Sequence, residues 1–155
     1  MGPKVKIDSP GVQSYLEILQ GVINRMALNS SGCKTWCIAL VSAIVVIIAD
    51  KGKPQFVWIS IFPVLLFLFL DTYYLSLEIR FRDRYNDFIR KLHADDATIE
   101  DLFIVTPGRG FRNIAKSSIK ALLSPSVWPF YGLLIAMMFI IRFWLLWSMM
   151  AKRVP

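Results

Sequence analysis

The sequence contains few of the residues that build disulfide frameworks or metal sites. Of its 155 residues, two are cysteines, Cys33 and Cys37, and one is a histidine, His93. Two cysteines cannot form the framework of a disulfide-rich domain. A single histidine leaves a histidine-based metal site without a second imidazole ligand, and Asp95 and Asp96 beside it are more typical of a solvated loop than of a cation site. The sequence therefore predicts no metal centre.

Several motifs are absent as well. The first twenty residues contain no apolar run, so they do not predict a signal peptide. The chain has neither a GxGxxG fingerprint nor a Walker loop, and no internal repeat. No nucleophile lies in a pattern that would pair it with a base. We therefore expect no enzymatic activity and no cofactor.

Apolar residues, by contrast, are in excess. They make up 55% of the chain, and the mean hydropathy of +0.51 is too high for an ordinary soluble domain. Three apolar runs alternate with charged segments, and each can approach the roughly 20 residues that a membrane-crossing helix needs. The sequence predicts an all-α integral membrane protein, with a transmembrane helical hairpin, a third C-terminal span and a small cytoplasmic helical layer.

Residues 1–32 predict an amphipathic N-terminal helix. Ser9 and Pro10 are typical of an N-cap followed by the first helical position. The residues after them place an apolar side chain every three or four positions: Val12, Tyr15, Leu19, Val22, Ile23 and Met26. Such a helix lies on a membrane surface or packs on another helix. We favour packing against the apolar face of residues 77–92.

Residues 33–77 predict the transmembrane hairpin. The first apolar run covers residues 36–49, and it is long enough to span if it is counted from Ser30 with Lys34 reaching the interface. The turn DKGKPQ at residues 50–55 leads into the second run, at residues 56–70. Cys33 and Cys37 lie one helical turn apart, a spacing that allows a metal or redox site. We favour small apolar residues in a helix contact.

The second span should continue beyond the membrane, as one helix from about residue 56 to residue 92. An apolar stripe at helical spacing runs through its charged second half: Leu77, Phe81, Tyr85 and Phe88. Because such a face is costly to leave in water, the stripe should be covered by this chain or by a second copy, which makes it an oligomer or packing stripe.

Residues 78–125 predict the cytoplasmic helical region. Thr98 and Asp101 suggest a capped helix start, and residues 102–105 are either a helix end or a short strand. A Pro-Gly turn then opens an amphipathic helix over residues 111–123. Basic side chains gather around this turn and along the helix: Arg109, Arg112, Lys116 and Lys120. They predict contact with anionic lipid headgroups or, as the alternative, with a nucleotide second messenger.

Residues 126–155 predict the third transmembrane segment, from about 127 to 150, and a basic tail. Arg142 lies within this run, where burial of its charge costs roughly 3 kcal/mol on insertion scales. It either faces water, a partner or an oligomer axis, or it reaches towards the headgroups beside Trp144 and Trp147. Asp71, the other charge in a membrane-like run, is expected to be solvated at the interface beside two tyrosines. Its depth disfavours a direct pair with Arg142.

The distribution of basic residues predicts the orientation. The chain carries a formal net charge of +7, and most of its lysines and arginines fall in the N-terminal and central segments. The positive-inside rule then places the N-terminus and the central segment in the cytoplasm. It also explains the net charge without nucleic acid, which we do not expect as a partner. The C-terminus should be outside, unless the third run enters the membrane only halfway.

Two stretches of this sequence resemble a family of small bacterial inner-membrane proteins of unassigned biochemistry. The first is LQGVINRMA at residues 19–27, with Asn29-Ser30 and KTW at 34–36. The second is LDTYYL at 70–75, with Glu78, RFR at 80–82 and Tyr85-Asn86. The resemblance covers about the first ninety residues. It implies a role beside antiviral or nucleotide-signalling systems, in which such proteins perturb the membrane.

Together these patterns favour a non-enzymatic, homo-oligomeric effector of the bacterial inner membrane that alters permeability, in antiviral defence. The alternative is an accessory subunit that anchors a cytoplasmic protein partner at the membrane. Leakage from liposomes separates the two functions.

Overall fold

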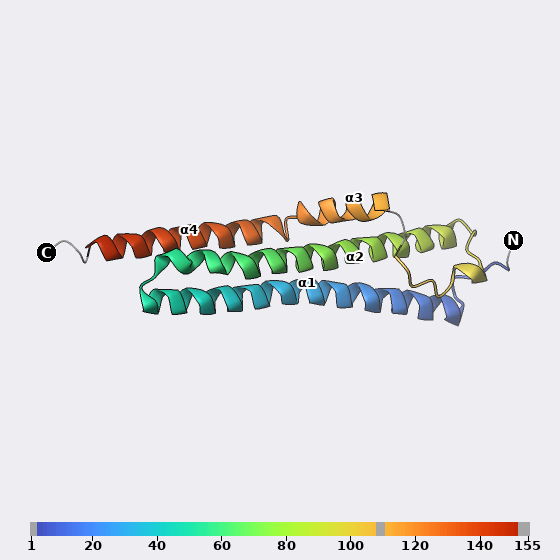
Figure 1. Cartoon of the computed structure of the whole chain (residues 1–155). Coiled ribbons are helices and arrows are strands. Elements are labelled where there is room, and N and C mark those ends of the chain that lie inside the picture. Colours follow the sequence, from blue (N-terminus) through green and yellow to red (C-terminus); the bar gives the residue numbers. More distant parts are fainter. Residues whose placement is uncertain (1–2, 108–110, 152–155) are drawn as a thin grey trace. The chain divides into compact units, whose positions relative to one another are not determined.

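The computed structural model describes residues 3–107 and 111–151, apart from the side chains of five residues: Pro54, Phe111, Arg112, Met149 and Ala151. Within these ranges the chain is helical and contains no strand, as the all-α prediction requires (Figure 1). Its elements in order are α1 (Pro10–Lys51), η1 (Pro54–Ser60), α2 (Ile61–His93), η2 (Ile99–Asp101), α3 (Phe111–Leu122) and α4 (Trp128–Ala151).

Three helical segments of the described chain are long and apolar enough to cross a membrane. They cover Pro10–Lys51, Gln55–His93 and Trp128–Ser148. Many of their large apolar side chains are exposed: Phe62 is 80% exposed, Phe69 68% and Phe143 68%. Lipid is the environment in which such surfaces are stable without a protein partner.

Helix α1 is longer than either element predicted for it. The sequence indicated an amphipathic helix up to residue 32 and a separate span from residue 33, whereas one helix runs from Pro10 to Lys51. Gly21 and Gly32 do not interrupt it, because an isolated glycine costs a helix only about 1 kcal/mol relative to alanine. The helix ends where Gly52 takes a positive φ of 59°, which glycine adopts without steric penalty.

Helix α2 begins later than predicted. The expected start near residue 56 is wrong, because Pro54–Ser60 form the 3₁₀ helix η1 and the α-helix starts at Ile61. Pro63 explains the position: proline lacks an N–H and is tolerated in the first turn of an α-helix but not further along it. The helix then runs to His93, one residue beyond the expected end.

The described chain packs as two compact units. Unit 1 comprises Met1–Asn29 and Tyr73–Ala121, and unit 2 comprises Ser30–Thr72 and Leu122–Pro155. Both α1 and α2 contribute to both units. The units therefore do not coincide with the sequence ranges 1–32, 33–77, 78–125 and 126–155, which follow the polarity of the chain rather than its packing.

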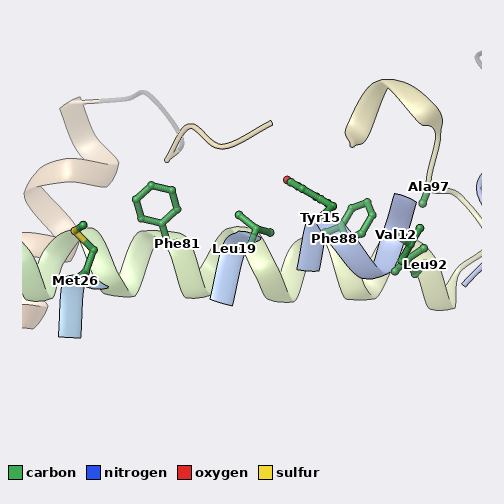
Figure 2. Close-up of a cluster of buried hydrophobic side chains, with 8 residues drawn as sticks. All are labelled: Val12, Tyr15, Leu19, Met26, Phe81, Phe88, Leu92 and Ala97. Carbon is green, nitrogen blue, oxygen red and sulfur yellow. The ribbon is translucent and has the colours of Figure 1, made fainter. Parts of the chain in front are cut away.

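The core of unit 1 joins the N-terminal part of α1 to the C-terminal part of α2 (Figure 2). Tyr15 and Phe88 meet edge to face with their ring centroids 4.8 Å apart. The buried members come from both helices and the following loop: Val12, Tyr15, Leu19, Met26, Phe81, Phe88, Leu92 and Ala97. Leu77 and Tyr85 are partly buried against this cluster. The apolar stripe of α2 is thus covered by this chain itself.

The segment after α2 is bonded to the last turn of α2 and to the N-terminal segment before α1. The carboxylate of Asp101 accepts hydrogen bonds from the Thr98 N–H at 3.1 Å and from the Lys91 ammonium at 2.6 Å. The hydrogen bond from Lys91 lowers the pKa of Asp101. Lys4 forms an isolated antiparallel bridge with Thr98. Residues 102–105, for which a helix end or a strand was expected, are neither; Phe103 takes a positive φ of 60° instead.

Helix α3 packs on α2 through serines. The hydroxyls of Ser76 and Ser117 lie 2.9 Å apart and are buried, and Ser118 lies 3.3 Å from Ser76. Ser117 also donates to the carbonyl of Asn113, which orients its side chain. In unit 2, α4 contributes the buried side chains of Tyr131, Met138 and Leu145.

Replacement of Phe81 and Phe88 by serine should destabilise unit 1. Truncation of a buried phenylalanine costs about 3–5 kcal/mol, and serine adds an unpaired hydroxyl. We expect the free energy of unfolding in detergent to fall by at least that amount for the double variant. Phe103→Ser is the matched control, because Phe103 is 55% exposed and should lose less than about 1 kcal/mol. Equal stability of the double variant and the control would contradict this packing.

Candidate functional site

A charged pair lies inside unit 2. Asp71 of α2 is fully buried, and Ser30 and Lys34 of α1 converge on its carboxylate. The Lys34 ammonium lies 2.7 Å from Oδ2 of Asp71, and the Ser30 hydroxyl donates a hydrogen bond to Oδ1. Ser30 and Lys34 are four residues apart, which places them on the same helix face. Both carboxylate oxygens are thus engaged from one turn of α1.

This environment corrects the prediction for Asp71. The sequence predicts a solvated carboxylate at the interface beside Tyr73 and Tyr74, with Lys34 reaching the interface as well. Instead, Asp71 is 0% exposed and the side chain of Lys34 is only 19% exposed. Removing two ions from water costs several kcal/mol for each, and their attraction offsets this cost only in good geometry with further hydrogen bonds. Ser30 supplies such a bond.

Two thiols and a phenol are also buried in unit 2. Cys33 and Cys37 of α1 are free, buried cysteines. Tyr131 of α4 is 2% exposed. In the described ranges, no three His, Cys, Asp or Glu side chains are grouped so that they could hold a metal ion. The chemistry of this centre is therefore that of an ion pair that links helices.

The other intramembrane charge, Arg142, has an aromatic partner. Its guanidinium carbon lies 5.1 Å from the centroid of the Trp58 ring in η1, which is within the range of a cation–π interaction. Trp58 in turn meets Phe139 edge to face at 5.3 Å. The Nε atom of Arg142 is buried and has no hydrogen-bond partner among the described residues. In the same ranges, no carboxylate forms an ion pair with this arginine.

The predicted anion-contact residues are only partly described. Arg109 lies outside the described residues, and so does the side chain of Arg112. Lys116 and Lys120 line a groove of about 470 Å³ in unit 1, between α2 and α3. Arg80 and Arg84 of α2 line the same groove. The sequence patterns do not identify these two arginines as groove residues, because their position depends on how α3 packs on α2.

Comparison of the chain with protein-family models, with curated proteins and with solved structures finds no match in any of the three searches. Function must therefore be inferred from the residues of the chain itself.

A double-mutant cycle tests the buried pair. Asp71→Leu alone leaves the Lys34 ammonium without its counter-ion, and Lys34→Met alone does the same to the carboxylate. Each single change should cost about 3–5 kcal/mol of unfolding free energy in detergent. The double variant should recover most of this loss, because two apolar side chains of similar size replace the pair.

The outcome that contradicts the pair is additivity, with the double variant losing the sum of both single losses. Lys51→Met is the control, since Lys51 is an exposed lysine at the end of the same helix; it should change stability by less than about 0.5 kcal/mol.

Proposed function

We propose that the protein is an oligomeric effector of the bacterial inner membrane that alters membrane permeability, in the antiviral setting that the sequence resemblance implies. The observation that carries this proposal is the incomplete compensation of Arg142 inside an apolar helix. A guanidinium stays protonated in practice and presents five N–H donors. The Trp58 ring makes a cation–π contact with the guanidinium, but it is not a hydrogen-bond acceptor for these N–H groups.

Water, lipid phosphate or a second copy can supply the missing acceptors. The apolar side chains of α4 around Arg142 are exposed, with Ile140 at 66%, Phe143 at 68% and Trp144 at 64%. These surfaces suit contact with lipid or with neighbouring copies. If copies assemble around an axis near α4, a ring of Arg142 side chains lines a wet path across the bilayer. Such a ring favours anions.

The buried pair of unit 2 supports this assignment of roles. Asp71, an acid within a membrane-like run, is already neutralised by Lys34 at 2.7 Å. It is therefore not available to Arg142, whose charge must be compensated from elsewhere. The orientation we propose, with the N-terminus in the cytoplasm, follows from the basic residues of the N-terminal and central segments. Anionic headgroups are the lipid partners that those residues would contact.

Leakage of an anionic dye from liposomes tests the function. Purified protein reconstituted into vesicles of phosphatidylethanolamine and phosphatidylglycerol should release carboxyfluorescein. Arg142→Leu should abolish this release while membrane insertion stays normal or improves, because an uncompensated charge is removed from the bilayer. Arg142→Lys, which keeps the charge, should retain part of the release.

Arg25→Leu serves as the matched control, because Arg25 is an exposed arginine of α1 in unit 1 and should leave the release unchanged. Full release by Arg142→Leu would contradict a role for this residue in permeation. Intact vesicles at all concentrations of the wild-type protein would contradict the effector function itself.

One observation favours the alternative, a subunit that anchors a cytoplasmic partner. The loop after α2 exposes three large apolar side chains close together in sequence, Ile99 at 53%, Phe103 at 55% and Ile104 at 37%. Exposed apolar residues of this kind outside the membrane segments are typical of a protein contact. A specific partner that binds this loop while vesicles stay intact would favour anchoring over permeation.

A further inference from the structure

The groove of unit 1 is built by two helices that are hydrogen-bonded to each other. One wall comes from α2 and the other from α3, and the pair of buried hydroxyls on Ser76 and Ser117 joins the walls. Ala121, one turn beyond Ser117 on α3, is fully buried. The groove is therefore formed by packed elements rather than by a loop. Its volume of about 470 Å³ falls within the range of small-molecule sites.

Basic side chains dominate the lining. Each wall contributes two of them, four residues apart and thus on one face of its helix: Arg80 and Arg84 on α2, and Lys116 and Lys120 on α3. Asp83 and Asp87 are the acidic side chains of the lining. Asp87 forms an ion pair with Arg90, which is not a lining residue, so part of its charge is already compensated outside the groove.

Three of the basic residues, Arg84, Lys116 and Lys120, retain capacity for a ligand. Arg80 donates a long hydrogen bond to the Pro107 carbonyl, at 3.5 Å. Among the described residues, no carboxylate forms an ion pair with Arg84, Lys116 or Lys120. The Nε atom of Arg84 is buried, and the described chain offers it no hydrogen-bond partner. Like charges collected in one groove repel each other until an anion binds between them.

We propose that this groove binds a phosphate-bearing ligand. An arginine presents a fork of N–H donors that matches two phosphate oxygens, and lysines add point charges from the opposite wall. A phosphate monoester carries up to two negative charges and three strong acceptor oxygens, which cations on two facing walls can satisfy. A single carboxylate brings only one negative charge and two acceptor oxygens. The phosphate belongs either to a lipid headgroup or to a soluble compound.

Two ligands distinguish these sources. Titration calorimetry on the whole chain in non-ionic detergent would measure the affinity for a short-chain phosphatidic acid, whose headgroup is a phosphate monoester, and for inorganic pyrophosphate. Binding of the first alone assigns the groove to a lipid headgroup, and binding of the second assigns it to soluble phosphates. In either case the affinity should fall steeply with salt, because the attraction is between charges. The permeability function plays no part in this test.

Substitution locates the binding. The double variant Arg84→Gln with Lys120→Gln should bind the ligand more weakly. Its dissociation constant should rise about tenfold for each charge-assisted hydrogen bond that is removed. Lys6→Gln with Arg25→Gln is the matched control: it removes the same charges from exposed positions outside the groove, and it should leave affinity within about twofold.

If the double variant fails to fold, Lys116→Gln decides instead, since Lys116 is exposed and its loss should not disturb packing. Equal losses in groove and control variants would overturn the proposal, because binding would then follow net charge. So would the absence of binding by both ligands at millimolar concentration.

Discussion

The ion pair between Lys34 and Asp71 is the contact on which the arrangement of α1 and α2 in unit 2 depends. Apolar side chains of similar size can be exchanged between neighbouring positions with little penalty, so an apolar interface alone defines helix register weakly. A carboxylate that is fully buried tolerates no such exchange. A shift of α1 by one residue turns its side chains by about 100° and would carry both Ser30 and Lys34 away from the carboxylate. The ion pair therefore fixes the register in which α1 and α2 pack.

The fold class could be predicted because it depends on local patterns. Runs of apolar residues indicate membrane-crossing helices, and the period of 3.6 residues indicates which face of each polar helix is covered. The stripe through Phe81 and Phe88 and the facing positions Tyr15 and Leu19 were readable in this way, and they meet in the core of unit 1. The start of α2 could not be predicted in this way, since an apolar composition alone does not distinguish a 3₁₀ turn before Pro63 from an α-helix.

The environment of Asp71 could not be predicted one residue at a time, because its partner lies on another helix. A signal was nevertheless present. In an antiparallel hairpin, residues equally far from the turn lie side by side, and Lys34 and Asp71 are almost equally far along the chain from Gly52, where the turn occurs. Tyr15 and Phe88, which meet edge to face, obey the same relation. The four-residue spacing of Ser30 and Lys34 then predicts that both face the same carboxylate. No comparable pattern in the sequence predicts that Trp58 lies beside Arg142.

The three charged side chains of unit 2 discussed above therefore have different consequences. Lys34 and Asp71 neutralise each other, which makes them a structural device that holds two helices in register. Arg142 has a ring beside it but no counter-ion in the described chain, so its charge is the one that can act on the surroundings. In unit 1 the charges of α2 and α3 gather instead along a groove. We thus propose that stability, permeation and ligand binding depend on separate groups of residues.

Infrared spectroscopy of the protein in lipid tests the central claim most directly. The difference spectrum between the wild type and Asp71→Asn should show the loss of an ionised carboxylate band, and that band should shift in a Lys34→Met background because its counter-ion is gone. Loss of a protonated carboxyl band instead, or a carboxylate band that is indifferent to Lys34, would contradict the ion pair and the helix register that we derive from it.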